Sequence, residues 1–255
     1  MVNLLIVASL IIILCVIFNK VSSKLGVPML LFFILLGMLF GADGIFKIDF
    51  GDYHIAESIC STALIFIMFY GGFGTKWSEA KPIAVKAVML SSLGVILTAL
   101  IVGLFCYFVL KIEILESLLI GSVISSTDAA SVFSILRSKK LGLKYNTASL
   151  LEVESGSNDP CSYMLTSIIL AVMSGQAQGG AIVYMIFSQI VYGVVLGFVF
   201  AFVTRWLVKK ISLETAGFDA ILVLAMAVLA YAVPSAIGGN GYLSVYLCGI
   251  ILGSC

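Results

Sequence analysis

The chain has 255 residues, of which 62% are hydrophobic and only 11% are charged, and its mean hydropathy is +1.20. Soluble domains carry about 25% charged residues, so this composition excludes a soluble globular protein and indicates an integral membrane protein. The formal net charge of +1 offers no basic surface for nucleic acid. The apolar runs have the length of helices, unlike the alternating segments of a membrane β-barrel, so we predict an all-α, polytopic fold.

Nine segments in chain order are predicted to be transmembrane helices, because a span needs about 20 predominantly apolar residues. They cover residues 2–19, 27–42, 57–75, 83–110, 115–137, 147–174, 182–209, 217–235 and 241–255. The last segment is short for a full crossing and looks cut off at the chain end.

The Lys and Arg residues predict the orientation of these helices. Twelve of the 14 fall in the first, third, fifth and seventh loops, and only Lys47 and Lys111 fall in even-numbered loops. Cytoplasmic loops carry the excess of basic residues. The alternation therefore predicts an N-terminus outside and odd-numbered loops in the cytoplasm.

The segment 147–174 contains a cluster of polar residues at membrane depth. Asp159 lies 12 residues after Thr147, about 18 Å along a helix axis, and is therefore near the midplane of a hydrocarbon core about 30 Å thick. Ser155 and Asn158 share its helix face, and Pro160 leaves the carbonyl four residues earlier without its helical partner. An ionisable group at this depth costs at least about 2.5–3.5 kcal/mol, so we predict a cation or proton site centred on Asp159.

The segment 115–137 brings a second polar run to the same level. Residues 125–131 read Ser-Ser-Thr-Asp-Ala-Ala-Ser, where lipid would favour Leu or Ile. Such a run is typical of a locally unwound helix whose carbonyls line a cavity. We therefore predict a broken helix near 125–131, with Thr127 and Asp128 close to Asp159.

Structural alternatives stay open for several of these residues. Ser125, Ser126 and Ser131 could form interhelical hydrogen bonds, Asp128 could cap a broken helix, and Asp159 itself could be structural. Glu154 fits a buried ion pair as well as ion ligation, and Glu152 fits a solvated position at the mouth of the site. The six cysteines are scattered and His54 is the single histidine, so no cofactor and no transition-metal site is predicted.

Two motifs in these helices closely resemble the signatures of the monovalent cation:proton antiporter-1 family, the Na⁺/H⁺ and K⁺/H⁺ exchangers. They are Thr127–Phe133 (TDAASVF) and Leu151–Pro160 (LEVESGSNDP). Further similarity lies in Lys24–Pro28, in the pair Gly71-Gly72 and in Gly241–Gly249 (GYLSVYLCG). The resemblance covers essentially the whole chain and implies a fold of two inverted repeats with crossed, broken helices.

The resemblance also implies roles for individual residues. Asp159 would bind the cation and the proton in turn, beside Asn158, its partner in the Asn-Asp pair associated with electroneutral exchange. Asp128, the Thr127 carbonyl and Ser155 would complete the shell around an alkali cation.

Glu154 would form a buried ion pair, with Pro160 supporting the site. Tyr70 departs from the pattern, because many relatives have an acidic residue there; a cation ligand would then be lost or replaced by a phenol oxygen. The implied domains are helices for dimerisation or scaffolding, a transport core, a linker helix and the incomplete start of a second repeat, in residues 1–75, 83–174, 182–209 and 217–255.

The predicted function is therefore not enzymatic: it is electroneutral exchange of Na⁺ or K⁺ for H⁺ across the plasma membrane by a multi-pass protein. The expected partners are these ions, the lipid bilayer and a second copy of the chain. Two alternatives remain at this stage. One is a truncated, non-transporting membrane scaffold, and the other is an ion channel subunit, although no filter motif is evident.

Overall fold

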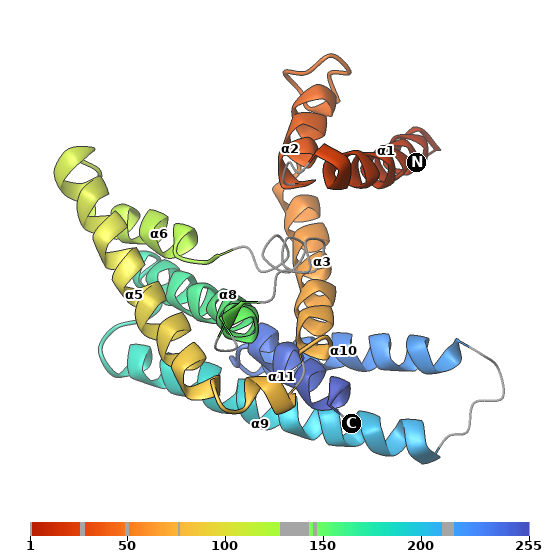
Figure 1. Cartoon of the computed structure of the whole chain (residues 1–255). Coiled ribbons are helices and arrows are strands. Elements are labelled where there is room, and N and C mark those ends of the chain that lie inside the picture. Colours follow the sequence, from red (N-terminus) through yellow and green to blue (C-terminus); the bar gives the residue numbers. More distant parts are fainter. Residues whose placement is uncertain are drawn as a thin grey trace. The chain divides into compact units, whose positions relative to one another are not determined.

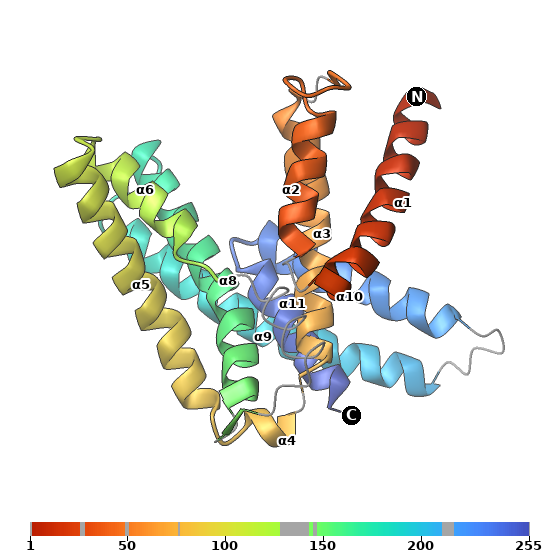
Figure 2. The same ribbon diagram turned by 45° about the horizontal axis from the view of Figure 1, so that its top comes forward.

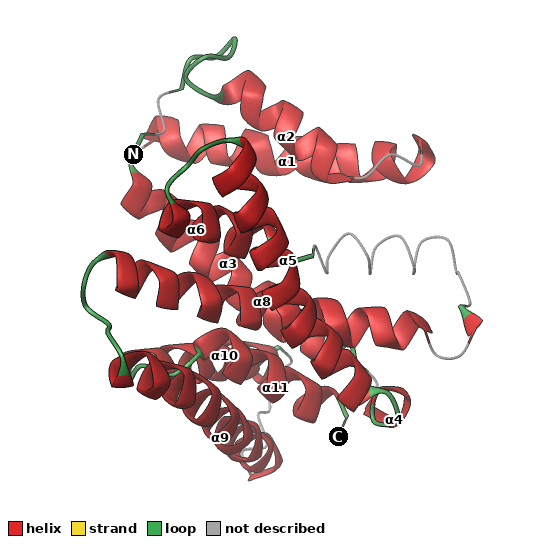
Figure 3. Ribbon diagram, turned by 90° about the vertical axis from the view of Figure 1, so that its left-hand side faces the viewer, coloured by secondary structure: helices red, strands yellow, loops and turns green. Residues whose placement is uncertain are grey.

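The structure of the protein is a computed structural model that describes residues 2–25, 29–48, 51–75, 77–127, 143–144, 147–210 and 217–254. Within these ranges the regular secondary structure is helical, without strands, and loops join the helices (Figures 1 and 3). The helices are α1 (Val2–Leu25), α2 (Met29–Phe40), α3 (Tyr53–Phe73), α4 (Trp77–Ala80), α5 (Ala84–Val109), α6 (Ile114–Ile124), α8 (Thr147–Met173), α9 (Gly180–Lys210), α10 (Phe218–Ala236) and α11 (Gly241–Gly253). The prediction of an all-α protein is confirmed.

A helix is present in each of the nine predicted ranges, but several ends differ. Helix α1 continues to Leu25 through residues predicted as a loop, and the short α4 was not predicted. Helix α3 begins at Tyr53, four residues early, because the Asp52 carboxylate accepts hydrogen bonds from the backbone N–H groups of His54 (3.0 Å) and Ile55 (3.2 Å). This side chain satisfies two of the N–H groups that a helix start leaves unpaired.

Four of the described helices, α3, α5, α9 and α10, are long and apolar enough to cross a membrane. Shorter apolar helices lie within α1, α2, α6 and α11. Large apolar side chains such as Val85 and Ile101 are mostly exposed on the outer faces of the helices, as expected where lipid replaces water. The protein is therefore a multi-pass membrane protein, and the number of nine crossings stays a prediction.

In the described part of the chain there are two compact units, one within Met1–Ile59 and the other within Cys60–Val132 and Gly142–Cys255. In the first unit α1 packs on α2, and the rings of Phe18 and Phe32 stack with centroids 5.3 Å apart. The division falls within α3. The functional roles proposed for the domains stay predictions.

In the second unit α5, α6 and α8 run alongside one another (Figure 2). Gly121 of α6 lies directly on α5, and a Cβ atom there would be 2.2 Å from the carbonyl oxygen of Ala99. Small residues allow membrane helices to approach to backbone contact. This close packing holds α6 on α5, and α6 also packs on α8.

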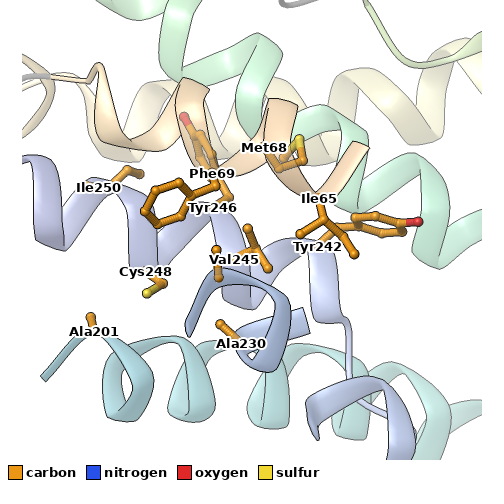
Figure 4. Close-up of a cluster of buried hydrophobic side chains, with 11 residues drawn as sticks. Ile65, Met68, Phe69, Ala201, Ala230, Tyr242, Val245, Tyr246, Cys248 and Ile250 are labelled. Atoms are coloured by element: carbon orange, nitrogen blue, oxygen red, sulfur yellow. The ribbon is translucent and has the colours of Figure 1, made fainter. Parts of the chain in front are cut away.

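Helix α11 is the most enclosed helix of this unit, and it packs on α8, α9, α10 and the second half of α3. Gly72 of α3 faces α11, since its Cβ would lie 2.4 Å from the carbonyl oxygen of Tyr246, and Gly249 of α11 faces the carbonyl oxygen of Phe69. With 13 residues α11 is about 20 Å long, too short for a full crossing, as predicted. Its buried apolar side chains form a cluster with residues of α3, α9 and α10 (Figure 4).

Candidate functional site

The site begins where α6 ends. The last helical residue is Ile124, the cap is Ser125, and Ser126 and Thr127 follow without helical structure. The Ser125 hydroxyl donates to the carbonyl oxygen of Ser122 at 2.6 Å, which satisfies one of the carbonyl groups left unpaired at a helix end. The predicted break is confirmed at residues 125–127. Asp128 and residues 129–131 lie outside the described residues.

Helix α8 supplies the other half of the site. It has 27 residues, and Asp159 and Pro160 lie at its middle, 12 and 13 residues after Thr147. Because proline has no N–H, the carbonyl of Gly156 lacks its usual helical donor. The midway position predicted for Asp159 therefore agrees with the observed helix.

Hydroxyl and amide groups connect the two halves. The Ser126 hydroxyl donates to Oδ1 of Asp159 and lies 3.3 Å from Oδ1 of Asn158. The amide Nδ2 of Asn158 donates to Oγ1 of Thr127, which lies 3.1 Å from Oγ of Ser155. The structure thus brings Thr127, Ser155, Asn158 and Asp159 together, as the sequence predicted.

Glu154 flanks this cluster on α8. Its carboxylate oxygens accept from the Ser155 hydroxyl at 3.3 Å and from Nδ2 of Asn158 at 3.4 Å. Within the described ranges no Lys, Arg or His side chain pairs with Glu154. The buried ion pair that the resemblance implies for it therefore stays a prediction.

Tyr70 lies elsewhere on α3. Its side chain is 65% exposed and lines a shallow apolar hollow with Phe66, Phe73 and Leu224. No hydrogen bond joins Tyr70 to Asp159 or its neighbours in the described part of the chain. A supporting role for Tyr70 stays a prediction, and no hydrogen bond between the described residues supports it.

Helix α11 contributes two residues that sequence reasoning missed. Asn240 caps α11 by accepting from the backbone N–H of Leu243 at 3.0 Å, and its Nδ2 donates to the carbonyl oxygen of Pro160 at 2.8 Å. The preference of helix N-caps for Asn could have located this residue. The second is Tyr246, whose ring packs on Gly156.

The chemistry of the cluster suits a small hard cation. In the described residues no three His, Cys, Asp or Glu side chains group together as transition-metal ligands. The available groups are the Asp159 carboxylate with hydroxyl and amide oxygens, and neutral oxygens with a carboxylate are hard ligands. Asn158 and Ser155 are each 1% exposed, Ser126 and Asp159 are half-buried, and Thr127 is exposed among the described residues, so the cluster is buried on α8 and more open at the end of α6.

Comparison with known proteins decides the family. The family model described as "Sodium/hydrogen exchanger, transmembrane" matches residues 8–254. The chain belongs to the sodium/hydrogen exchanger family. This agrees with the resemblance noted in the two motifs.

Individual members of this exchanger family give the same result. The chain is 37% identical over 235 residues to the K⁺/H⁺ antiporter NhaP of Alkalimonas amylolytica, an alignment covering 92% of this chain and 41% of that protein. It is 35% identical over 242 residues to the K⁺/H⁺ antiporter NhaP2 of Shewanella sp. (strain ANA-3), covering 94% and 42%. The chain therefore spans less than half the length of these two relatives.

The fold is also that of a solved exchanger. The structure of the sodium proton antiporter MjNhaP1 from Methanocaldococcus jannaschii at pH 8 matches with a TM-score of 0.81 and 25% sequence identity. The match covers 98% of this chain and 64% of that one. The helix arrangement is therefore that of a cation/proton antiporter over essentially the whole chain.

Proposed function

We propose that the protein exchanges a monovalent cation, Na⁺ or K⁺, for H⁺ across the cell membrane and catalyses no chemical reaction. One observation carries the proposal. The carboxylate of Asp159 lies midway along α8 and faces the hydroxyl groups at the broken end of α6. Hydroxyl, amide and carboxylate oxygens meeting at membrane depth form a site for a desolvated cation.

Competition at one carboxylate explains how exchange follows from this geometry. In a low-dielectric site the charge of Asp159 is stabilised either by a proton or by a nearby cation. Because one occupant excludes the other, each passage of the loaded site carries one of them. The empty, charged site would resist crossing the hydrocarbon core, so leak is suppressed.

The neutral neighbour of Asp159 sets the proposed stoichiometry. Asn158 occupies the adjacent position and donates to Thr127, and its amide carries no titrating charge. A single carboxylate that alternates between one proton and one cation moves no net charge per cycle. We therefore propose electroneutral exchange, with Thr127, Ser155 and Asp128 as further cation ligands and Glu154 and Pro160 as supporting residues.

The remaining proposals concern the complete protein in its membrane. We place it in the plasma membrane with the N-terminus outside, as the distribution of Lys and Arg indicates. A second copy of the chain is the proposed partner, with the ions and the bilayer and without nucleic acid.

Asp159→Asn tests the function. In everted membrane vesicles we expect the unsubstituted protein to collapse a preformed pH gradient when Na⁺ or K⁺ is added, and the variant to lose this response. Asp219→Asn is the matched control, because Asp219 is exposed in the first turn of α10 and its variant should exchange normally. Cation-dependent proton flux through Asp159→Asn would overturn the assignment. Flux without proton coupling in the unsubstituted protein would favour a channel, and no flux at all a scaffold.

A further inference from the structure

Tyr246 is a buried phenol at the contact between α11 and α8. The side chain is 2% exposed, and Figure 4 shows its ring on the side of the apolar cluster away from Ala201 and Ala230. A Cβ atom added to Gly156 would lie 2.5 Å from both Oη and Cζ of Tyr246. The phenol oxygen therefore lies directly on α8, one helical turn before Asp159 and Pro160.

The surroundings of this oxygen are polar. The hydroxyl groups of Thr75 and Ser157 flank it, and the carboxylates of Glu152 and Asp159 are near enough to act on it electrostatically. Even so, Oη forms no hydrogen bond of standard geometry within the described ranges. The Thr75 hydroxyl donates to the carbonyl oxygen of Gly71 at 2.9 Å and so offers Oη only its acceptor lone pairs.

A buried hydroxyl that forms no hydrogen bond of standard geometry with any described residue needs an explanation. Leaving such a group without a partner costs free energy, and a bound ion or water is a usual reason for one in a native structure. Apolar packing alone would be served equally well by a phenylalanine ring. Packing therefore explains the ring of Tyr246 but leaves the presence of its hydroxyl group unexplained.

We infer that Oη of Tyr246 is a further neutral oxygen ligand of the transported alkali cation, contributed by α11 to the site on α8. The inference rests on the proposed function, because it adds a ligand to the same site. A cation between Asp159 and this phenol would hold α8 and α11 together while the site is occupied. When a proton replaces the cation, the phenol loses this partner, so the α8–α11 contact would differ between the two loaded states.

The test compares cation binding in Tyr246→Phe and in the unsubstituted full-length protein. Binding is followed by the rise in melting temperature of the purified protein as NaCl or KCl replaces choline chloride. We expect the cation concentration for half-maximal stabilisation to rise about tenfold, which corresponds to about 1.4 kcal/mol. Without cation, the melting temperature should be unchanged or higher, because the variant removes a buried hydroxyl that forms no hydrogen bond of standard geometry within the described ranges.

Tyr242→Phe is the matched control. Tyr242 lies one turn earlier on α11 and is also buried, but its ring packs on Tyr163 and Tyr231 instead of Gly156. Its variant should bind the cation like the unsubstituted protein. If Tyr246 is a ligand, Tyr246→Phe weakens stabilisation by the cation but does not lower the melting temperature measured without cation. If Tyr246 were only a packing residue, its replacement would lower the melting temperature both with and without cation.

Asp159→Asn separates failure of the inference from failure of the proposed function. If it abolishes cation stabilisation while Tyr246→Phe leaves the concentration dependence unchanged, the phenol is no ligand and the proposed function stands. The same result would follow if Oη held only a water molecule. If Asp159→Asn keeps full cation stabilisation, the site itself is wrong and the inference is overturned with it.

Discussion

Replacing Asn240 should leave the carbonyl oxygen of Pro160, the residue after Asp159 on α8, without its hydrogen-bond donor. The side chain is 2% exposed and makes two hydrogen bonds, one that caps α11 and one to Pro160 on α8. Its backbone N–H also donates to the carbonyl oxygen of Gln189 on α9 at 3.1 Å, a bond that a substitution would keep. Because Leu243 offers a donor and Pro160 an acceptor, the partners fix which side-chain atom is oxygen and which is nitrogen.

The two side-chain bonds set the magnitude for Asn240→Ala. Loss of an N-cap costs about 1 kcal/mol, and a buried carbonyl left without its partner costs about 1–3 kcal/mol. The sum is about 2–4 kcal/mol of folding stability. For a chain of this length we expect a melting temperature lower by about 5 °C or more.

Asn240→Asp separates the two bonds. Aspartate keeps the cap, since Asp and Asn are equally good at this position, but its ionised carboxylate cannot donate to Pro160. The variant should melt at a lower temperature than the unsubstituted protein, and more so in alkaline than in acid buffer. Only the protonated acid can donate to the Pro160 carbonyl.

The assay is thermal unfolding of the purified protein in detergent without added Na⁺ or K⁺. Ser235→Ala is the matched control, because the exposed Ser235 hydroxyl bonds the Tyr231 carbonyl within its own helix, α10, and its loss should cost less than about 0.5 kcal/mol. The reasoning would be refuted if Asn240→Ala had the same melting temperature as Ser235→Ala. If the Asn240→Asp variant were as stable as the unsubstituted protein at every pH, the hydrogen bond to Pro160 would not contribute to stability.

Two further substitutions probe the contacts around Asp159. Gly156→Ala should destabilise the protein by about 1–3 kcal/mol, because its methyl group would overlap the Tyr246 ring in a packed interior. Gly94→Ala on α5 is the control, because its methyl group would enter open space, and it should be neutral or stabilising by up to about 1 kcal/mol. Equal melting temperatures of the Gly156→Ala and Gly94→Ala variants would contradict the contact between Gly156 and Tyr246. Thr127→Val keeps the side-chain volume but removes the oxygen that meets Ser155 and Asn158, so we expect exchange in vesicles to fall about tenfold, the effect of losing one hydrogen bond. Ser92→Ala, which removes an exposed hydroxyl bonded within α5, should exchange normally, and full activity of Thr127→Val would exclude that oxygen from the site.

Much of the site could be predicted from sequence because helical spacing is local. Ser155, Asn158 and Asp159 share a face of α8 by periodicity alone, and the depth of Asp159 follows from counting residues at 1.5 Å each. The polar run after Ile124 predicted the end of α6 because small polar residues are poorly suited to a lipid-facing helix. These inferences needed no knowledge of which helices touch.

The residues that were missed depend on contacts between distant segments. Asn240 is 80 positions from Pro160, and Tyr246 reaches α8 only because glycines bring α3, α8 and α11 together. Tyr70, for which the resemblance left open either a lost cation ligand or a phenol oxygen in its place, is exposed and lines an apolar hollow on α3; its role stays a prediction. Gly72 lies on the face of α3 that packs against α11. Tyr70 lies on the other, exposed face of α3.

The sequence by itself determined the class of protein, the helical segments, the depth of the aspartate and, through two motifs, the family. Only the tertiary structure decided which faces are buried and which residues of α11 meet α8. In water, an amphipathic pattern marks the buried face of a helix. In lipid, both faces are apolar and association depends on close packing and interhelical hydrogen bonds, which a sequence that is apolar all round, like that of α5, does not reveal.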